Sequence, residues 1–134
     1  MEKIAIDDFK KVEISVGEIL SAEPVSGSLK LLRLRVNFGL KLSAEGSADQ
    51  PEASVGTEDI RQVVSGIAKH FPDLALLVGK RCAFVTNLEP RVMMGLESQA
   101  MILATGGGSL PDRPGECEPL FLFESNAAPG SHAH

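Results

Sequence analysis

The chain has 134 residues, of which 43% are hydrophobic and 23% charged, and its formal net charge is −5. This composition is that of an ordinary globular protein and excludes disordered and fibrous classes. The apolar runs fall far short of the roughly 20 residues that a membrane-spanning helix needs, and the N-terminus carries acids where a signal peptide carries an apolar segment. We therefore expect a soluble, cytoplasmic protein with one domain over residues 1–134.

Two cysteines, Cys82 in a predicted strand and Cys117 near the end of the chain, are typical of a protein from a reducing compartment. The sequence favours two unpaired thiols, and it leaves a single disulfide between them open.

The acidic residues are concentrated in two segments. Nine of the 18 acids lie within residues 42–59 or in the tail after residue 105, whereas of the 13 basic residues only Lys41, at the edge of the first segment, and Arg113, in the tail, lie outside the body of the chain. The remaining body holds nine acids and 11 bases, so it is about +2. A net charge of −5 taken alone argues against a nucleic-acid partner, but this distribution allows a locally basic face.

The first predicted elements are a helical turn and two strands. Asp7 and Asp8 are placed to cap the turn, after which residues 12–16 alternate between apolar and polar as a strand does. Gly17 then predicts a bulge or a sharp bend. Residues 32–38 alternate cleanly and place Arg33 and Arg35 on the outer side of a half-buried strand. These arginines have two open interpretations, solubility and binding.

Residues 42–59 are small, polar and acidic with no period, which predicts a flexible loop. A short strand then reaches Val64, Ser65 can cap a helical turn, and Pro72 ends that turn. A fourth strand is expected within residues 79–88 and a fifth over 98–105. Gly106, Gly107 and Gly108 lack the lysine and helix of a phosphate loop and are interpreted as a linker.

Five strands with one short helix between the third and fourth, a bend in the first strand and a single core match a small all-β closed barrel of the OB-fold type, followed by a C-terminal extension over residues 106–134.

No catalytic constellation is found in the sequence. No pair among His70, His132 and His134 has metal spacing in a predicted element, and neither Ser65 nor Ser98 has an evident histidine partner. CxxC and nucleotide-binding glycine motifs are absent from the sequence. We therefore expect a protein without enzymatic activity, metal or cofactor.

Residues 87–104, "NLEPRVMMGLESQAMILA", are chemically richer than a hairpin needs. The amide of Asn87 can bond a phosphate, a ribose or a base, and Pro90 stiffens the loop before Arg91. Met93 and Met94 offer soft apolar surfaces for a base. Ser98 and Gln99 begin the next strand and are expected near Asn87. In the alternative interpretation Asn87 and Ser98 satisfy the loop's own backbone, and the methionines plug the barrel end.

Five segments, "VEISVGEIL", "KLLRLRVNFG", "RQVVSGIAKHF", "LVGKRCAFVTNLEPRVMMGLESQAMILA" and "APGS", together resemble the tRNA-binding domain found at the C-terminus of many methionyl-tRNA synthetases. This domain also occurs in free-standing tRNA-binding proteins, cytokine-like synthetase cofactors and a secretion-related chaperone. The resemblance runs from Ile4 to Ser131 apart from the loop at 42–59. It implies an OB-fold barrel, binding of folded tRNA mainly by shape and backbone, and a homodimer for stand-alone members.

The resemblance implies that Lys30, Ser65, Asn87, Arg91 and Ser98 face RNA, and the strand pattern adds Arg33 and Arg35 as phosphate neighbours. The predicted RNA-binding residues are thus Lys30, Arg33, Arg35, Ser65, Asn87, Arg91, Met93, Ser98 and Gln99. Gly66 and Gly95 are expected to serve the backbone, and Glu97 to orient the loop.

The chain departs from the family pattern at three places. Val92 and Met94 stand where the family often has basic residues, which predicts weaker, less salt-dependent binding. The turn before Lys30 differs, and the acidic segment at 42–59 is an addition that would either repel RNA or act as a tether.

The sequence thus predicts a non-catalytic tRNA-binding protein, free-standing or aiding an aminoacyl-tRNA synthetase in trans. The alternative is a chaperone-like module of the same fold, binding unfolded polypeptide through Met93, Met94 and the segment "LFLF". A third interpretation is an interaction domain that recruits a synthetase.

Overall fold

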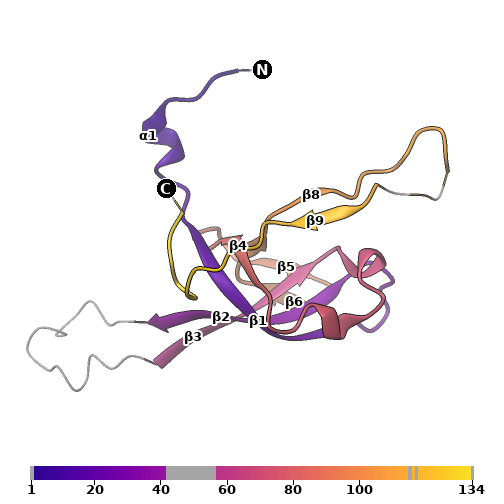
Figure 1. The fold of residues 1–134 in the computed structure, drawn as a ribbon, viewed down its shortest axis with the longest axis horizontal. Helices are drawn as coiled ribbons and strands as arrows, with labels where there is room; N and C mark the ends of the chain where they lie inside the picture. The colour runs from indigo at the N-terminus through magenta and orange to yellow at the C-terminus, as the bar shows by residue number, and fades with distance from the viewer. Residues whose placement is uncertain (1, 42–56, 115, 117, 134) are drawn as a thin grey trace, which may run out of the picture.

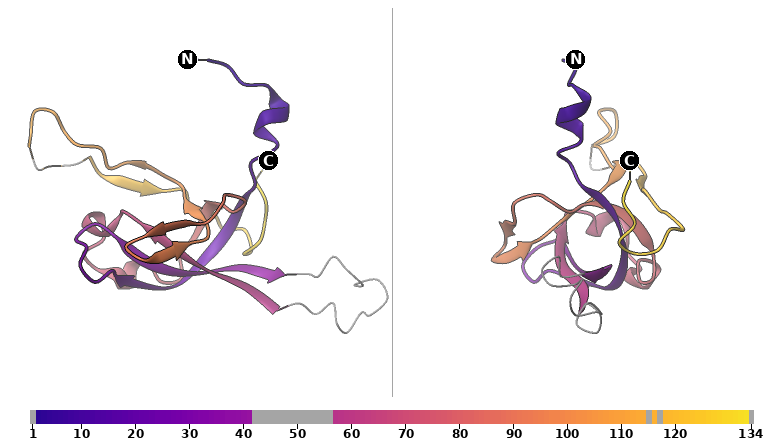
Figure 2. Two further views of the ribbon diagram at one scale, coloured as in Figure 1. Left: turned by 180° about the vertical axis from the view of Figure 1, so that it is seen from behind. Right: turned by 90° about the vertical axis from the view of Figure 1, so that its left-hand side faces the viewer.

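The fold is built on one strongly curled antiparallel sheet. A computed structural model describes residues 2–41, 57–114, 116 and 118–133. Its main sheet has the strand order β3-β2-β1-β4-β7. The strands are β1 (Ile14–Pro24), β2 (Leu32–Lys41), β3 (Thr57–Ser65), β4 (Arg81–Val85) and β7 (Met101–Ile102). Seen from the side, the strands curl around a common axis (Figure 2). The expected OB-like barrel is confirmed.

The other elements are short. They are the helix α1 (Ile6–Phe9), the 3-10 turns η1 (Ala68–His70) and η2 (Leu74–Leu76), the hairpin of β5 (Arg91–Met93) with β6 (Leu96–Ser98), and the hairpin of β8 (Ala104–Gly106) with β9 (Leu120–Leu122). Helix α1 stands clear of the barrel, and the β8–β9 hairpin projects from it (Figure 1). Within the described residues no helix is long and apolar enough to cross a membrane.

Several local predictions need correction. The helix expected between the third and fourth strands is a pair of 3-10 turns, and the N-cap of η1 is Ile67 because Ser65 still belongs to β3. Asp7 and Asp8 lie inside the first turn of α1, whose N-cap is Ala5, so neither caps it. Strand β3 begins at Thr57, so the last part of the predicted loop at 42–59 is strand; residues 42–56 lie outside the described residues.

The core is formed by the apolar face of β2 and its neighbours. The predicted alternation is confirmed, since Leu32, Leu34, Val36 and Phe38 are all buried. Phe38 meets Phe84 of β4 edge to face, with 5.2 Å between ring centroids and 83° between ring planes. Such aromatic pairs stabilise a core beyond the area they bury. The contact between Phe38 and Phe84 joins β2 to β4 across the inside of the curled sheet.

Gly17 allows β1 to curl over this core. A Cβ atom at Gly17 would lie 2.5 Å from Val36 Cγ1 and 2.7 Å from Phe38 Cε1, both closer than side chains tolerate. The bulge predicted at this glycine is found further along β1, where the register with β2 shifts between Ile19 and Ser21. Gly17 itself pairs regularly with Cys82. Gly17 is therefore needed because the side chains of Val36 and Phe38 approach its backbone closely, and not because it forms the bulge.

The C-terminal tail belongs to the barrel. The backbone N–H of Val16 donates to Ser131 O at 2.8 Å, Gly130 N–H donates to Val16 O at 2.7 Å, and Ala133 N–H donates to Ile14 O at 2.8 Å. The tail therefore adds a short pairing to the free edge of β1 near its start. Gly106, interpreted as the beginning of a linker, is instead the last residue of β8.

Cys82 is a free thiol in the core, as the sequence favours, and Cys117 lies outside the described residues. Burial, with a smaller contribution from the Glu124 carboxylate, raises the pKa of the Cys82 thiol to about 11. The sulfur is therefore protonated and unreactive at neutral pH.

We expect Gly17→Ala to lower the free energy of unfolding by about 1–3 kcal/mol, because the added methyl overpacks against Val36 and Phe38. Urea denaturation measures this change. The matched control is Gly66→Ala, where a Cβ meets nothing within 4 Å and the change should stay within about 0.5 kcal/mol. Equal stability of the two variants would contradict the role assigned to Gly17.

Candidate nucleic-acid interface

The β5–β6 hairpin is the centre of the candidate interface. Its strands pair Arg91 with Ser98 and Met93 with Leu96. The connecting residues Met94 and Gly95 both have positive φ, 52° and 77°, as two-residue hairpin turns often require. Met94 is the only non-glycine residue of the described parts with positive φ, and a side chain there costs roughly 1–2 kcal/mol. The tight two-residue turn imposes this conformation on Met94.

The segment that follows the hairpin closes the barrel against β3. Gln99 N–H donates to Gln62 O at 2.8 Å, and Gln62 N–H donates to the Gln99 side-chain oxygen at 3.0 Å. The Gln62 side chain donates to Glu97 O at 2.8 Å. Side chains thus replace part of the backbone ladder that two regular strands would make.

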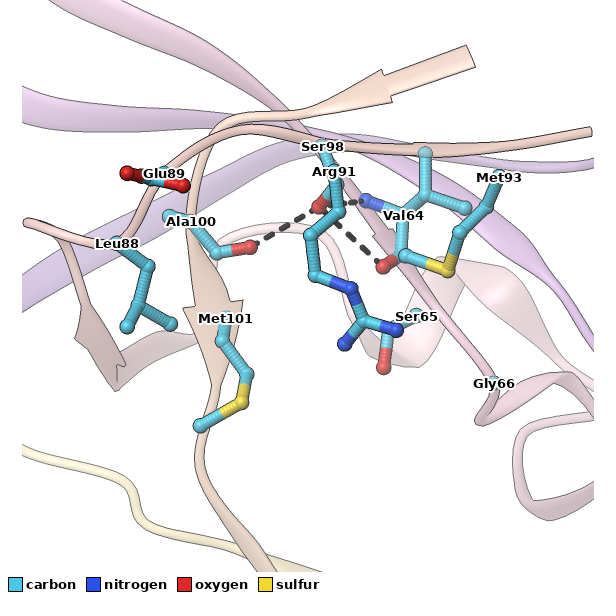
Figure 3. Close-up of a pocket in the computed structure, with 10 residues that line it drawn as sticks. All are labelled: Val64, Ser65, Gly66, Leu88, Glu89, Arg91, Met93, Ser98, Ala100 and Met101. Carbon is cyan, nitrogen blue, oxygen red and sulfur yellow. Dashed lines mark hydrogen bonds between the residues drawn. The ribbon is translucent and has the colours of Figure 1, made fainter. Parts of the chain in front are cut away.

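Ser98 completes this closure from a buried position. Its hydroxyl accepts from Val64 N–H at 3.0 Å and donates toward Ala100 O at 3.0 Å (Figure 3). Only 6% of Ser98 is exposed, so its side chain holds the interface together from beneath rather than facing a macromolecule. The fifth strand accordingly begins at Met101 rather than at Ser98.

Arg61 joins β3 to the segments around Thr86 and Gln99, a structural role that the sequence analysis did not predict. Its guanidinium donates to Thr86 O at 2.7 Å, pairs with Asp59 at 3.1 Å, and lies 5.2 Å from the centre of the Phe38 ring. It also reaches Gln99 O at 3.4 Å. Alternation with Val63 placed Arg61 on the inner side of β3, and this was the available signal.

Asn87 is bonded to the N-terminal segment. Its side-chain oxygen accepts from Glu13 N–H at 2.8 Å, and its amide nitrogen donates to Lys11 O at 2.6 Å. The alternative interpretation, in which the Asn87 side chain satisfies backbone groups, is correct in that respect. The backbone groups that it bonds belong to the segment after α1, however, and not to the loop that contains Asn87. Ser98 and Gln99 are expected near Asn87 from the sequence. Their bonds join them to other residues instead, because Ser98 pairs with Arg91 and Gln99 bonds to β3.

A pocket of about 210 Å³ lies beside the hairpin. Leu88, Met93 and Met101 belong to its apolar lining, and the guanidinium of Arg91 crosses it toward the hydroxyl of Ser65 (Figure 3). Among the described residues Arg91 has no carboxylate partner within salt-bridge distance. The complete lining is Val64, Ser65, Gly66, Leu88, Glu89, Arg91, Met93, Ser98, Ala100 and Met101.

The outer face of β2 adds basic side chains next to the hairpin. Arg33 is ion-paired with Glu23 and lines a second pocket with Met94 and Leu96. Arg35 is exposed and pairs in register with Gln62, whose side chain reaches the hairpin. We call the outer face of β2 together with the β5–β6 hairpin and its pocket the hairpin face.

Two lysines extend the hairpin face. Lys30 is exposed just before β2, and its carbonyl oxygen accepts from Ala68 N–H at 3.0 Å, which places Lys30 beside η1. Lys69, in η1, is exposed as well. The structure thus brings Ser65, Arg91 and Met93 into one pocket, with basic residues around it.

Other parts of the described chain offer no comparable centre for chemistry. No group of three or more His, Cys, Asp or Glu side chains within them could hold a metal ion. Ser15 and His132 are within 2.9 Å, a serine–histidine contact that the sequence did not reveal. It pairs the tail with β1.

The comparisons with known proteins identify the family. A model of the putative tRNA binding domain family matches residues 51–131, so the chain belongs to this family and the resemblance is confirmed. The methionine–tRNA ligase of Caldanaerobacter subterraneus is 40% identical over 104 residues, which cover 78% of this chain but only 13% of the ligase.

Solved structures show the same fold. The MetRS-related protein of Pyrococcus horikoshii matches over the full length of both chains, with a TM-score of 0.73 and 27% identity. The chaperone CsaA of Bacillus anthracis matches 99% of this chain and 100% of its own, with a TM-score of 0.66 and 20% identity, so it shares the fold.

We expect Ser98→Ala to lower the free energy of unfolding by about 1–3 kcal/mol, because the buried N–H of Val64 loses its acceptor. Chemical denaturation and amide exchange at Val64 measure the effect. The matched control is the exposed Ser26, whose alanine variant should be as stable as the wild type. A Ser98→Ala variant of unchanged stability would show that the hydroxyl does not close the barrel.

Proposed function

We propose that the chain is a non-catalytic tRNA-binding protein that recognises folded tRNA mainly by shape and backbone, free-standing or aiding an aminoacyl-tRNA synthetase in trans. Family membership supports this function. The observation that carries it is the set of uncompensated cations on the hairpin face of an acidic protein, namely Lys30, Arg35, Lys69 and Arg91. Elsewhere in the described chain Lys11, Lys80, Arg81 and Arg113 are ion-paired. Lys3 and Lys10, which have no carboxylate partner among the described residues, lie on either side of the short helix α1 rather than on the barrel.

In this proposal the residues of the interface have different tasks. Lys30, Arg35 and Arg91 neutralise phosphates, which supplies most of the affinity and its salt dependence. Arg33 joins them only where a phosphate replaces the carboxylate of Glu23, its partner in the free protein. Ser65 and Met93 contact the RNA from the pocket. Ser98, Gln99 and Asn87 act by position, because their polar atoms already bond the chain itself.

We further propose that the protein acts in the cytoplasm as one domain over residues 1–134, without a cofactor, and as a homodimer. The dimer is supported by apolar side chains that the single chain leaves uncovered. Ile6, the first residue of α1, is 65% exposed, and Ile4, just before α1, is 68% exposed. Phe121 of β9 is 65% exposed. Apolar patches of this kind mark interaction sites, and a second copy is the simplest cover.

A chaperone-like module that binds unfolded polypeptide is the second candidate. It is favoured by the exposed apolar residues Val92 and Met94 at the tip of the hairpin. The fold is shared with the chaperone CsaA, which makes such a module structurally reasonable. Binding of polypeptide would be indifferent to salt, because it would use apolar area rather than cations.

We expect labelled bulk tRNA to bind at low salt and to weaken steadily as salt is added. Arg91→Gln should weaken binding by about tenfold, the effect of one contact worth about 1.4 kcal/mol, and should flatten the salt slope by nearly one unit. Arg113→Gln removes the same charge at an exposed, ion-paired site and is the matched control. Absence of binding at low salt, or equal effects of the two substitutions, would argue against the proposal.

We expect the double variant Ile6→Asp with Phe9→Asp to shift the protein from dimer to monomer, because buried carboxylates would oppose the apolar contact. Sedimentation velocity measures the mass. Leu29→Asp places the same charge on a residue that is 88% exposed in the β1–β2 connection and should leave the mass unchanged. A wild-type protein that sediments as a monomer at micromolar concentration would refute the dimer.

A further inference from the structure

The pocket beside the hairpin differs from the rest of the hairpin face, because it is mainly apolar and holds a single cation. We propose that it receives one unstacked nucleotide of the RNA, with the base among Leu88, Met93 and Met101 and the phosphate beside Arg91 and Ser65. This inference rests on the proposed function and names the feature of the RNA that the site requires.

The size of the pocket fits one ring system. Its volume is about 210 Å³. A protein cavity of about 150 Å³ lined by apolar side chains accepts benzene, so this pocket has room for a pyrimidine and for much of a purine. A base paired within a helix could not enter it, because neighbouring stacked bases would have to enter as well.

The walls suit an aromatic ring. The thioethers of Met93 and Met101 come from different strands, β5 and β7, and Leu88 lies next to Met101 (Figure 3). Methionine sulfur makes favourable contacts with aromatic rings, and its flexible chain adapts to rings of different size. A sequence-tolerant site for a base is therefore expected from these residues.

The rim sets the orientation of the nucleotide. The planar guanidinium of Arg91 can pair with a phosphate or lie against a base, and the hydroxyl of Ser65 can bond either. Glu89 also lines the pocket, and its carboxylate lies away from both in Figure 3. Because a carboxylate repels phosphate, the phosphate is directed to the side of Arg91 and Ser65.

The pocket is formed before RNA arrives. Ser98 forms part of the inner wall of the pocket. The hydrogen bonds of the Ser98 hydroxyl to Val64 and Ala100 hold this wall in place. A preformed site spares the complex the cost of ordering its own residues. Folded RNA offers such a site unstacked bases in its loops and bulges, where they can be splayed out of the helix.

A side chain of an unfolded polypeptide is the competing occupant. It would suit the apolar walls, but it would cover Arg91 without giving this guanidinium an anionic partner, and burying an unpaired charge is costly. A nucleotide supplies the apolar ring and the anion together. The charge of Arg91 therefore favours RNA over polypeptide.

The methionine methyl groups provide a direct test. Met93 and Met101 line the pocket, whereas the methyl carbon of Met94 lies 3.5 Å from the position of a Cβ at Gly27, outside it. In protein labelled with ¹³C at the methionine methyls, bulk tRNA should shift the Met93 and Met101 signals upfield through the ring current of the base. The Met94 signal should move much less. Single Met→Leu variants assign the signals.

The outcomes separate this inference from the proposed function. If tRNA binds and the Met93 and Met101 signals stay in place, the nucleotide pocket is refuted and RNA binding stands. If tRNA does not bind at low salt, the proposed function fails and the pocket with it. A blunt RNA duplex is expected to bind without shifting either signal, because it has no unstacked base. Shifts caused by an unfolded polypeptide but not by tRNA would assign the pocket to protein side chains.

Arg91→Lys gives an independent check, because it keeps the charge and removes the planar group. We expect tRNA to bind about threefold to tenfold more weakly to this variant with an unchanged salt slope, while duplex RNA binds as it does to the wild type. Identical tRNA affinity for the wild type and Arg91→Lys would mean that Arg91 acts as a charge alone, and would overturn its place beside a bound nucleotide.

Discussion

The structure depends on the way the curled sheet is closed between β3 and the residues after β6. A regular ladder would close it with backbone groups alone. Here the side chains of Gln62, Ser98 and Gln99 supply part of the bonding, and Arg61 adds its guanidinium across the gap. Side-chain closure allows the chain to leave the ladder at this point, and the β5–β6 hairpin is the segment that leaves it.

The closure and the candidate site are therefore one construction. Ser98 fixes the inner wall of the pocket and pairs in register with Arg91, whose guanidinium crosses the same pocket. A substitution that opens the barrel at Ser98 also moves the site, whereas a substitution at Arg91 changes the site alone. The β5–β6 hairpin, from Arg91 to Ser98, combines these tasks within a few residues.

Charge is arranged so that an acidic chain can offer a basic face. Most arginines of the described parts lie close to carboxylates, as in the pairs Arg81–Glu18 and Arg61–Asp59. Exposed ion pairs of this kind add little stability, but they remove those cations from competition for an anionic partner. Arg35 and Arg91 have no such partner among the described residues, and with the exposed Lys30 and Lys69 they give the hairpin face uncompensated positive charge.

Beside the family resemblance that indicated the OB-like barrel, the sequence by itself determined the apolar alternation of β2 and the five strands of the main sheet, because these follow from a period of two and from local turn signals. It also singled out residues 87–104. Only the tertiary structure decided what several of these residues do. Asn87 bonds residues 74 and 76 positions away, and Ser98 bonds a partner 34 positions away. Periodicity places a side chain on a face of its strand, but the folded chain decides which distant backbone groups lie within its reach.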